Sequence, residues 1–244
     1  MLTEQLKSKM AALKLGGMVK AFEEQMQSLN FYDFSFEERL GFLIEQESLD
    51  RENRRLQNRL KQAKLKAGAT LEDVDFKTER NLDKKQILSL GNCSWVMRKQ
   101  NIIITGPTGI GKSYLASSLA QKACREGFSS IYLRMPLLFE DLILAKLENR
   151  YKRFLERVAK VNVLVLDDWG LFSLNDDQRR GLLEVVEARY SVGSTLIVSQ
   201  VPVDQWFKLI GEPVIADAIL DRIVHNAQRI SLTGESMRKK LIEA

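Results

Sequence analysis

The stretch that decides the fold is Asn101-Ile-Ile-Ile-Thr-Gly106-Pro107-Thr108-Gly109-Ile110-Gly111-Lys112-Ser113, which runs into the helical pattern of Tyr114–Arg125. It matches the P-loop pattern GxxxxGK[ST] at every fixed position and lies between an apolar strand and a helix, as that motif requires. Its glycines let successive backbone N–H groups point at phosphate oxygens, and the helix N-terminus adds its positive dipole end. We therefore predict that residues 106–114 bind ATP, with Lys112 on the β and γ phosphates and the Ser113 hydroxyl on Mg²⁺.

An acidic pair ends a second apolar run, Val161-Asn-Val-Leu-Val-Leu166-Asp167-Asp168, about 55 residues after Lys112. An apolar strand that ends in acid at this distance from a P-loop is typical of a Walker B segment. Asp167, as the first residue past the strand, is expected to hold magnesium through water, and Asp168 to polarise the attacking water. The alternative is a surface turn. We expect the two motifs to meet where two neighbouring strands of one sheet end.

A third apolar run, Thr195-Leu-Ile-Val-Ser199-Gln200, also ends in polar residues. In a sheet that carries the other two motifs, this position is where a side chain can contact the γ-phosphate or the water. Ser199 and Gln200 are both candidates, and an ordinary turn after a strand is the alternative.

The remaining pattern predicts an α/β fold after a helical N-terminal part. β-branched runs recur at 101–105, 130–133, 161–166, 195–198 and 229–232, and the first four are separated by helix-length segments. This alternation predicts a three-layer αβα core with a five-stranded, mostly parallel sheet. Residues 1–70 hold no proline, show apolar residues at helical spacing, and contain the capping-box pattern Ser35-Phe-Glu-Glu38. We expect a helical domain over 1–70 and the nucleotide-binding domain over 71–244.

Composition indicates a globular cytoplasmic protein that does not enter a membrane. Of its 244 residues, 45% are hydrophobic and 28% charged, and no apolar run approaches the ~20 residues that span a bilayer. The charged start of the chain argues against an export signal. Cys93 and Cys124 lack metal-ligand spacing and only His225 could join them, so we expect packed thiols in a reducing compartment.

The net charge of +5 gathers in two cationic clusters, which could serve a polyanionic partner or form solvated helix faces. The first cluster comprises Arg51, Arg54, Arg55, Arg59, Lys61, Lys64 and Lys66. The second comprises Lys146, Arg150, Lys152, Arg153, Arg157 and Lys160. About six neutralised phosphates would give a slope of log affinity against log salt near −5. Because no base-reading motif is recognisable, we expect binding of duplex DNA that is largely independent of sequence.

Several segments together resemble the IstB family of transposition helper ATPases, which are AAA+ proteins related to the DnaC and DnaI helicase loaders and to DnaA. They are Ser35-Phe-Glu-Glu-Arg-Leu, Asp50-Arg-Glu-Asn-Arg-Arg-Leu, the P-loop, Leu164-Val-Leu-Asp-Asp-Trp-Gly170 and Gly234-Glu-Ser-Met-Arg238. The resemblance implies an ATP-hydrolysing, DNA-binding protein that forms homo-oligomers on target DNA and assists a transposase. The N-terminal helices are expected to meet the partner, a neighbouring subunit or the DNA.

The resemblance also implies an active site completed by an arginine of the neighbouring subunit. Arg222, in Ile219-Leu-Asp-Arg222-Ile, matches the segment that carries this residue, with a salt bridge to Asp217 or Asp221 as the alternative. Arg238 is a second candidate. The twelve residues after Leu232 are too few for the helical lid of other AAA+ proteins, as the resemblance also implies.

Two rival functions stay open at this point. A DnaC-like helicase loader would bind a hexameric helicase and single-stranded DNA. A P-loop kinase for small molecules would need a lid with its own arginines, and the acid pair favours water activation instead.

Overall fold

The computed structural model describes residues 2–28, 31 and 33–237, so Arg238 lies outside the described residues. The chain forms two compact units, Met1–Asn58 and Arg59–Ala244. The domain boundary that we expect after residue 70 stays a prediction. None of the helices in the described ranges combines the length and the apolar character needed to cross a membrane.

The first unit consists of α1 (Leu2–Ala12), α2 (Gly16–Gln27) and the first part of α3 (Phe36–Ala63). The predicted capping box starts α3: the Glu38 N–H donates to Ser35 Oγ at 3.2 Å, and the Ser35 N–H donates to Glu38 Oε2 at 2.8 Å. The buried Glu47 of α3 accepts hydrogen bonds from the first backbone N–H groups of α2, including that of Gly17 at 2.8 Å. Glu47 thus satisfies donors that no intrahelical acceptor can reach.

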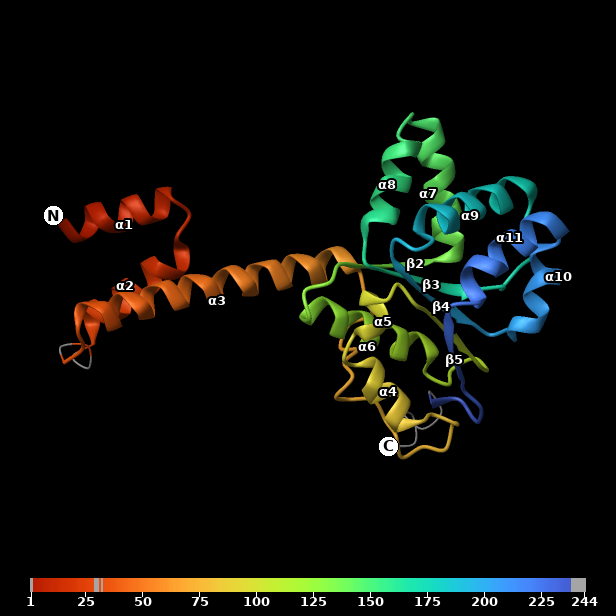
Figure 1. Ribbon diagram of the computed structural model, residues 1–244, viewed down its shortest axis with the longest axis horizontal. Coiled ribbons are helices and arrows are strands. Elements are labelled where there is room, and N and C mark those ends of the chain that lie inside the picture. The colour runs from red at the N-terminus through yellow and green to blue at the C-terminus, as the bar shows by residue number, and fades with distance from the viewer. Residues whose placement is uncertain (1, 29–30, 32, 238–244) are drawn as a thin grey trace. The chain divides into compact units, whose positions relative to one another are not determined.

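The second unit is a parallel sheet between two helical layers (Figure 1). Its strands are β1 (Asn101–Thr105), β2 (Ser130–Arg134), β3 (Val163–Trp169), β4 (Ser194–Ser199) and β5 (Ala227–Ser231). Every neighbouring pair is parallel and the order is β2-β3-β4-β1-β5. The predicted five-stranded αβα core is confirmed.

One detail of the prediction was wrong, because the strands of the P-loop and of the acid pair are not neighbours. Strand β4 pairs with β1 on one side and with β3 on the other. The site is therefore spread over the ends of three adjacent strands. Order along the chain does not decide order in a sheet whose strands are joined by helical crossovers.

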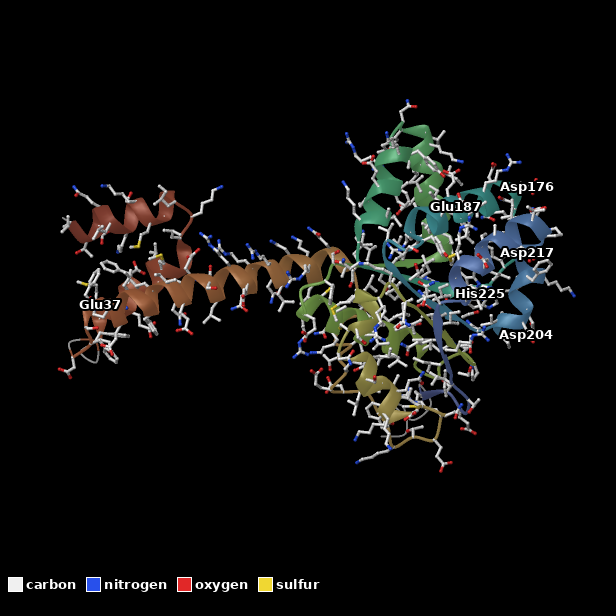
Figure 2. The ribbon with its side chains drawn as sticks, in the orientation of Figure 1. Glu37, Asp176, Glu187, Asp204, Asp217 and His225 are labelled. Atoms are coloured by element: carbon white, nitrogen blue, oxygen red, sulfur yellow. The ribbon has the colours of Figure 1, made fainter. Side chains whose placement is uncertain are left out.

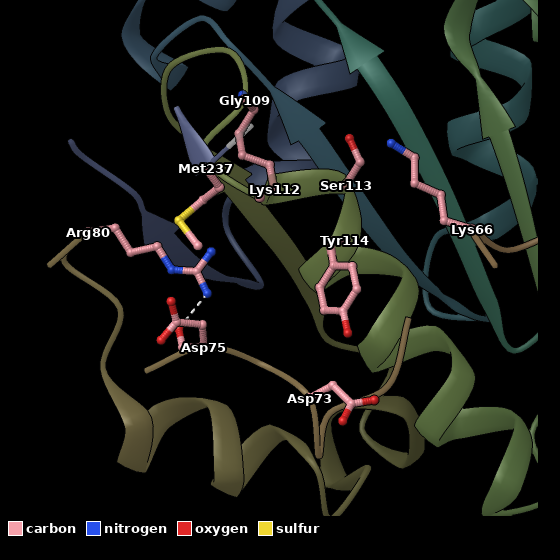
Figure 3. Close-up of a pocket in the computed structure, with 10 residues that line it drawn as sticks. Lys66, Asp73, Asp75, Arg80, Gly109, Lys112, Ser113, Tyr114 and Met237 are labelled. Atoms are coloured by element: carbon pink, nitrogen blue, oxygen red, sulfur yellow. Dashed lines mark hydrogen bonds between the residues drawn. The ribbon is translucent and has the colours of Figure 1, made fainter. Parts of the chain in front are cut away.

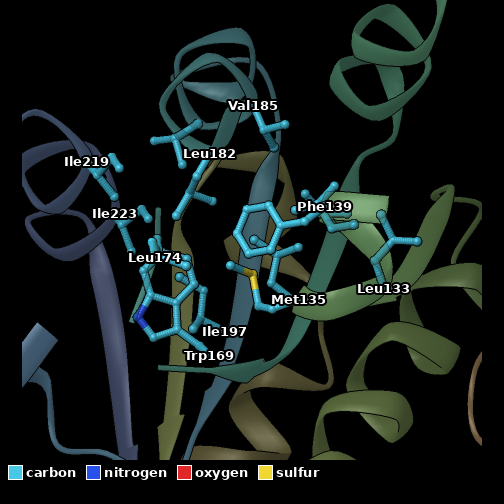
Figure 4. Close-up of a cluster of buried hydrophobic side chains, with 14 of the residues drawn as sticks. Leu133, Met135, Phe139, Trp169, Leu174, Leu182, Val185, Ile197, Ile219 and Ile223 are labelled. Atoms are coloured by element: carbon cyan, nitrogen blue, oxygen red, sulfur yellow. The ribbon is translucent and has the colours of Figure 1, made fainter. Parts of the chain in front are cut away.

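The helices divide between the two faces of the sheet, and each face has its own apolar cluster. One face carries α4 (Lys84–Leu90), α5 (Ser94–Met97) and α6 (Lys112–Arg125). The other carries α7 (Met135–Leu147), α8 (Tyr151–Lys160), α9 (Asp176–Arg189), the short 3-10 turn η2 (Val203–Gln205), α10 (Trp206–Ile210) and α11 (Pro213–Val224). In this second cluster, Phe139 and Leu182 pack over the centre of the sheet, close to Trp169 (Figure 4). This packing buries the apolar residues of β3, the strand that carries the acids.

After β5 the described chain covers only residues 232–237, which form no lid domain. This short segment runs beside the P-loop in the same direction. Leu232 N donates to Thr105 O at 2.8 Å, and Met237 N donates to Gly109 O at 2.9 Å.

Candidate nucleotide-binding site

The P-loop connects the end of β1 to the start of α6 in a conformation that only glycine can adopt. Gly106, Gly109 and Gly111 have φ angles of 147°, 82° and 97°. A Cβ on Gly109 would lie 2.1 Å from Ser236 Oγ, and one on Gly111 would lie 2.5 Å from an Arg80 guanidinium nitrogen. The loop is therefore a backbone cradle of the kind that phosphate groups occupy.

Lys112 is nearly buried, with 7% of its surface exposed, and its ammonium group lies inside this loop. Its Nζ donates to Gly106 O at 2.7 Å and to Pro107 O at 2.8 Å. Burial lowers the pKa of Lys112, while the charges of Asp167 and Asp168 act to raise it. A phosphate oxygen in the loop would be a stronger acceptor for this ammonium group than the two carbonyls.

Two cavities open on either side of the loop and share Lys66, Gly109, Lys112 and Ser113. The larger has a volume of about 600 Å³ and is also lined by Tyr114, Met237 and residues of the segment before β1, namely Asp73, Asp75 and Arg80 (Figure 3). The smaller, of about 390 Å³, holds the polar ends of β2, β3 and β4. The arrangement suits a molecule with an organic part on one side of the loop and phosphates on the other.

The segment before β1 supplies a buried arginine to the site. Arg80 is 4% exposed and donates to Ile110 O at 2.9 Å and to Asp75 O at 2.7 Å. Burial lowers the pKa of Arg80, and Asp75 acts in the opposite direction. Arg80 thereby ties the P-loop to the segment that walls the larger cavity, a role for which the sequence gives no signal.

The acid pair lies within β3, not just past its end as we predicted from the sequence. Pairing with β4 slips between Leu166 and Trp169, and Asp168 adopts a left-handed φ of 62°. A bulge of this kind turns side chains away from the strict alternation of a strand. As a result, Asp167 and Asp168 both line the smaller cavity, opposite Lys112 and Ser113.

Strand β2 contributes a hydrogen-bond donor to each acid. The Tyr132 hydroxyl donates to Asp167 Oδ2, and Arg134 Nε donates to Asp168 Oδ2 at 2.6 Å. Asp167 is buried, whereas the Arg134 side chain is 56% exposed. The hydrogen bond to Asp168 raises the pKa of Arg134. Neither β2 residue belongs to a recognisable sequence motif.

The two candidates at the end of β4 occupy different environments. The Ser199 hydroxyl is buried among backbone groups, 2.8 Å from Trp169 O, and accepts from Val201 N at 3.0 Å. Gln200 is exposed, and its Oε1 accepts a hydrogen bond from Thr108 Oγ1 of the P-loop at 2.6 Å. Both residues line the smaller cavity, but only the Gln200 side chain contacts the P-loop.

The residues present fit a hard divalent cation bound together with a phosphate. Ser113 and Asp167 bring a hydroxyl and a carboxylate to the same cavity, and Mg²⁺ prefers such oxygen ligands, with phosphate and water completing its shell. The described part of the chain contains no group of three His, Cys, Asp or Glu side chains that could hold a metal without a substrate. Cys93 and Cys124 are buried free thiols, as expected.

Arg222 lies at the other end of the sheet from the P-loop. Asn101, the first residue of β1, donates through Nδ2 to Arg222 O at 3.2 Å, whereas the P-loop follows the last residue of that strand. The Arg222 guanidinium donates to Ala218 O at 2.7 Å and to Glu187 Oε1 at 3.2 Å. Glu187, which is labelled in Figure 2, belongs to α9. Arg222 thus pairs with Glu187 rather than with Asp217 or Asp221.

The two cationic clusters differ in what they contact. In the first cluster, Arg51 and Arg54 pair with acids of α3, Arg59 Nε donates to Cys124 O at 3.0 Å, and Lys66 lines both cavities of the site. In the second cluster, every cation is exposed, from Lys146 at the end of α7 through α8, and Arg150 pairs with Glu148. Only the second cluster therefore presents all its charges to solvent.

Comparison with known proteins agrees with this site. A family model described as IstB-like ATP binding protein matches residues 8–243. A provisionally named insertion sequence ATP-binding protein of Sinorhizobium fredii is 46% identical over 239 residues, which cover 98% of each chain.

Solved structures share the fold. The crystal structure of DnaI has a TM-score of 0.58 at 23% identity, over 68% of this chain and 92% of that one. The replication initiator DnaA bound to AMPPCP and single-stranded DNA has a TM-score of 0.57 at 17% identity, over 74% of this chain and 55% of that one. At these identities the likeness concerns the AAA+ fold alone.

Proposed function

Because the chain belongs to the family of IstB-like ATP-binding proteins of insertion sequences, we propose that it is an Mg²⁺-dependent ATPase that assembles on duplex DNA and assists a transposase. The observation that carries the ATPase part is the smaller cavity. It brings together the ammonium group of Lys112, the oxygen ligands Ser113 and Asp167, and a second acid, Asp168. These groups come from separate segments and have no other evident reason to converge.

Each group has a distinct role in the proposed hydrolysis. The P-loop N–H groups and Lys112 bind the β and γ phosphates. To do so, the Lys112 ammonium group gives up its hydrogen bonds to Gly106 O and Pro107 O and donates to phosphate oxygens instead. Ser113 and Asp167 would hold Mg²⁺, which when bound neutralises charge on the phosphate oxygens. Asp168 accepts a proton from the attacking water, and Gln200, held by Thr108, is placed to orient that water or the γ-phosphate.

The ion pair between Arg134 and Asp168 suggests how turnover is restrained. While one oxygen of the Asp168 carboxylate accepts the hydrogen bond from Arg134 at 2.6 Å, that oxygen is occupied and is not available to a water molecule. Hydrolysis would therefore accelerate when Arg134 finds another anion, such as a phosphate. Arg222 of a neighbouring subunit would complete the site; its distance from its own P-loop supports a role at another subunit's nucleotide, for which it would leave Glu187.

The exposed cluster on α8 is our proposed DNA contact. Arg150 pairs with its neighbour Glu148, and Lys152, Arg153 and Arg157 are exposed on α8. The cations of α8 can approach phosphates, and backbone contacts of this kind accept many sequences. Charge reversal at Lys152, Arg153 and Arg157 should reduce the salt dependence of DNA affinity by about 0.9 per lost contact. An unchanged slope would place the DNA elsewhere.

ATP turnover tests the proposal directly. Asp168→Asn should retain ATP binding and lose about 10²–10⁴-fold in rate, as expected for loss of a general base. Lys112→Ala should lose tight binding itself, and Asp217→Asn, an exposed acid of α11, serves as the matched control. Full turnover in Asp168→Asn would contradict the assignment.

The partner separates the remaining alternatives. We place the protein in the cytoplasm, together with a transposase of its insertion sequence. Pull-down with that transposase supports this function, whereas selective capture of a replicative helicase would favour a loader. Turnover that required a small phosphate acceptor and ignored DNA would favour a kinase.

A further inference from the structure

Strand β2 lies against β3 in parallel register, with Tyr132 opposite Val165. This register brings the Tyr132 hydroxyl to the carboxylate two residues farther along β3, where it donates to Asp167 Oδ2. The other oxygen, Oδ1, accepts the Asp168 N–H at 2.8 Å. Both oxygens of a carboxylate that is only 4% exposed are therefore held by fixed donors.

The same phenol also faces Ser113. Burial raises the pKa of Tyr132, the hydrogen bond to Asp167 raises it further, and the Ser113 hydroxyl acts in the opposite direction. Tyr132, Ser113 and Asp167 all line the smaller cavity. The phenol thus interacts with both side chains expected to hold the metal.

We propose that Tyr132 is a positioning residue of the Mg²⁺ site, which fixes the Asp167 carboxylate through its hydroxyl so that the remaining lone pairs face Ser113 across the cavity. This inference rests on the proposed function. A carboxylate that must hold a cation gains from a donor that removes its rotational freedom, and outer partners of this kind are typically worth 10–100-fold in metal affinity.

A purely structural role for the hydroxyl makes a different prediction. The ring of Tyr132 packs with the apolar cluster beneath α6, and phenylalanine would preserve that packing. A hydroxyl needed only to satisfy a buried acceptor would affect stability, and would leave the magnesium requirement unchanged once the protein is folded.

The test is a fluorescence titration of the full chain with a fluorescent ATP analogue. It is done first in EDTA and then at fixed nucleotide with rising Mg²⁺. For Tyr132→Phe we expect an unchanged Kd in EDTA and about a tenfold increase in the Mg²⁺ concentration at half-saturation. Tyr151→Phe, which removes a hydroxyl from a residue of α8 that lines neither cavity, is the matched control and should behave as wild type.

Circular dichroism establishes that each variant is folded, and Tyr132→Met provides a second removal of the hydroxyl if Tyr132→Phe is not. An unchanged half-saturation in a folded variant overturns the inference. So does a lowered one, which would mean that the phenol competes with the metal. A wild-type chain that binds no nucleotide with or without Mg²⁺ would instead refute the proposed function.

Discussion

Replacing Arg80 by methionine tests whether this buried side chain, which lies outside the P-loop motif, holds the P-loop in its nucleotide-binding conformation. Methionine keeps much of the aliphatic volume and removes the guanidinium group, whose bonds to Ile110 O and Asp75 O are lost. Hydrogen bonds from a charged donor are worth about 1.5–3 kcal/mol each, or about 3–6 kcal/mol for the pair. Part of this is offset, because within the described chain Arg80 Nε has no partner and the buried charge is costly.

We therefore expect the free energy of unfolding of Arg80→Met to fall by about 2–4 kcal/mol, which for a unit of this size lowers Tm by about 4–16 °C. The bond to Ile110 O lies within the P-loop itself. Its loss, at about 1.5 kcal/mol, should weaken nucleotide binding about tenfold. Urea denaturation followed by circular dichroism measures the first quantity, and titration with a fluorescent nucleotide measures the second.

Arg98→Met, at an exposed arginine just after α5, is the control and should change neither quantity. Surface substitutions usually change the free energy of unfolding by less than about 0.5 kcal/mol. If Arg80→Met changed it by no more than that, the two hydrogen bonds of Arg80 would not contribute to the stability of the fold. If stability fell and nucleotide affinity did not, Arg80 would support the fold without positioning the loop.

Three further perturbations address other parts of the chain. Burial acts to raise the pKa of Glu47, but hydrogen bonds from Arg51 and the start of α2 lower it overall, so the first unit should lose stability as pH falls below about 4.5. Glu47→Gln should unfold at lower urea at pH 7 and lose that pH dependence. Burial raises the pKa of Cys93 to about 11, so a thiol reagent at pH 8 should label it only on unfolding, and rapid labelling of the native protein would contradict its burial. Arg134→Gln removes the ion pair with Asp168 and should raise DNA-independent phosphate release about twofold to fivefold. That change in rate corresponds to about 0.5–1 kcal/mol. A lower rate of phosphate release would mean that Arg134 assists hydrolysis.

Local patterns in the sequence were sufficient for the core of the fold and for the parts of the site that are themselves local. The P-loop is a continuous run whose glycines dictate its shape, so its residues could be predicted together. The same holds for the capping box at Ser35 and Glu38, where the donor and the acceptor are three residues apart.

Contacts between distant segments were beyond such patterns. Arg80, Tyr132 and Arg134 belong to no motif, and each acquires its role only because the sheet and the segment before β1 bring it to the loop or the acids. Lys66 lines both cavities, but its sequence context shows only that it belongs to a cationic cluster. The bulge in β3 was also missed, because nothing in Leu166-Asp167-Asp168 distinguishes an acid after a strand from one within it.

The position of Arg222 near the start of β1, with the P-loop at the end of that strand, bears on how copies of the chain could associate. If Arg222 serves a neighbour's nucleotide, the donating and receiving surfaces of one subunit are different surfaces. An isologous dimer about a two-fold axis would not be the natural assembly, because such pairing matches a patch with itself. In a heterologous, head-to-tail assembly, the subunit at one end has an unused Arg222 surface and the subunit at the other end has an unused nucleotide site. Such an assembly either closes into a ring or continues as a helical filament.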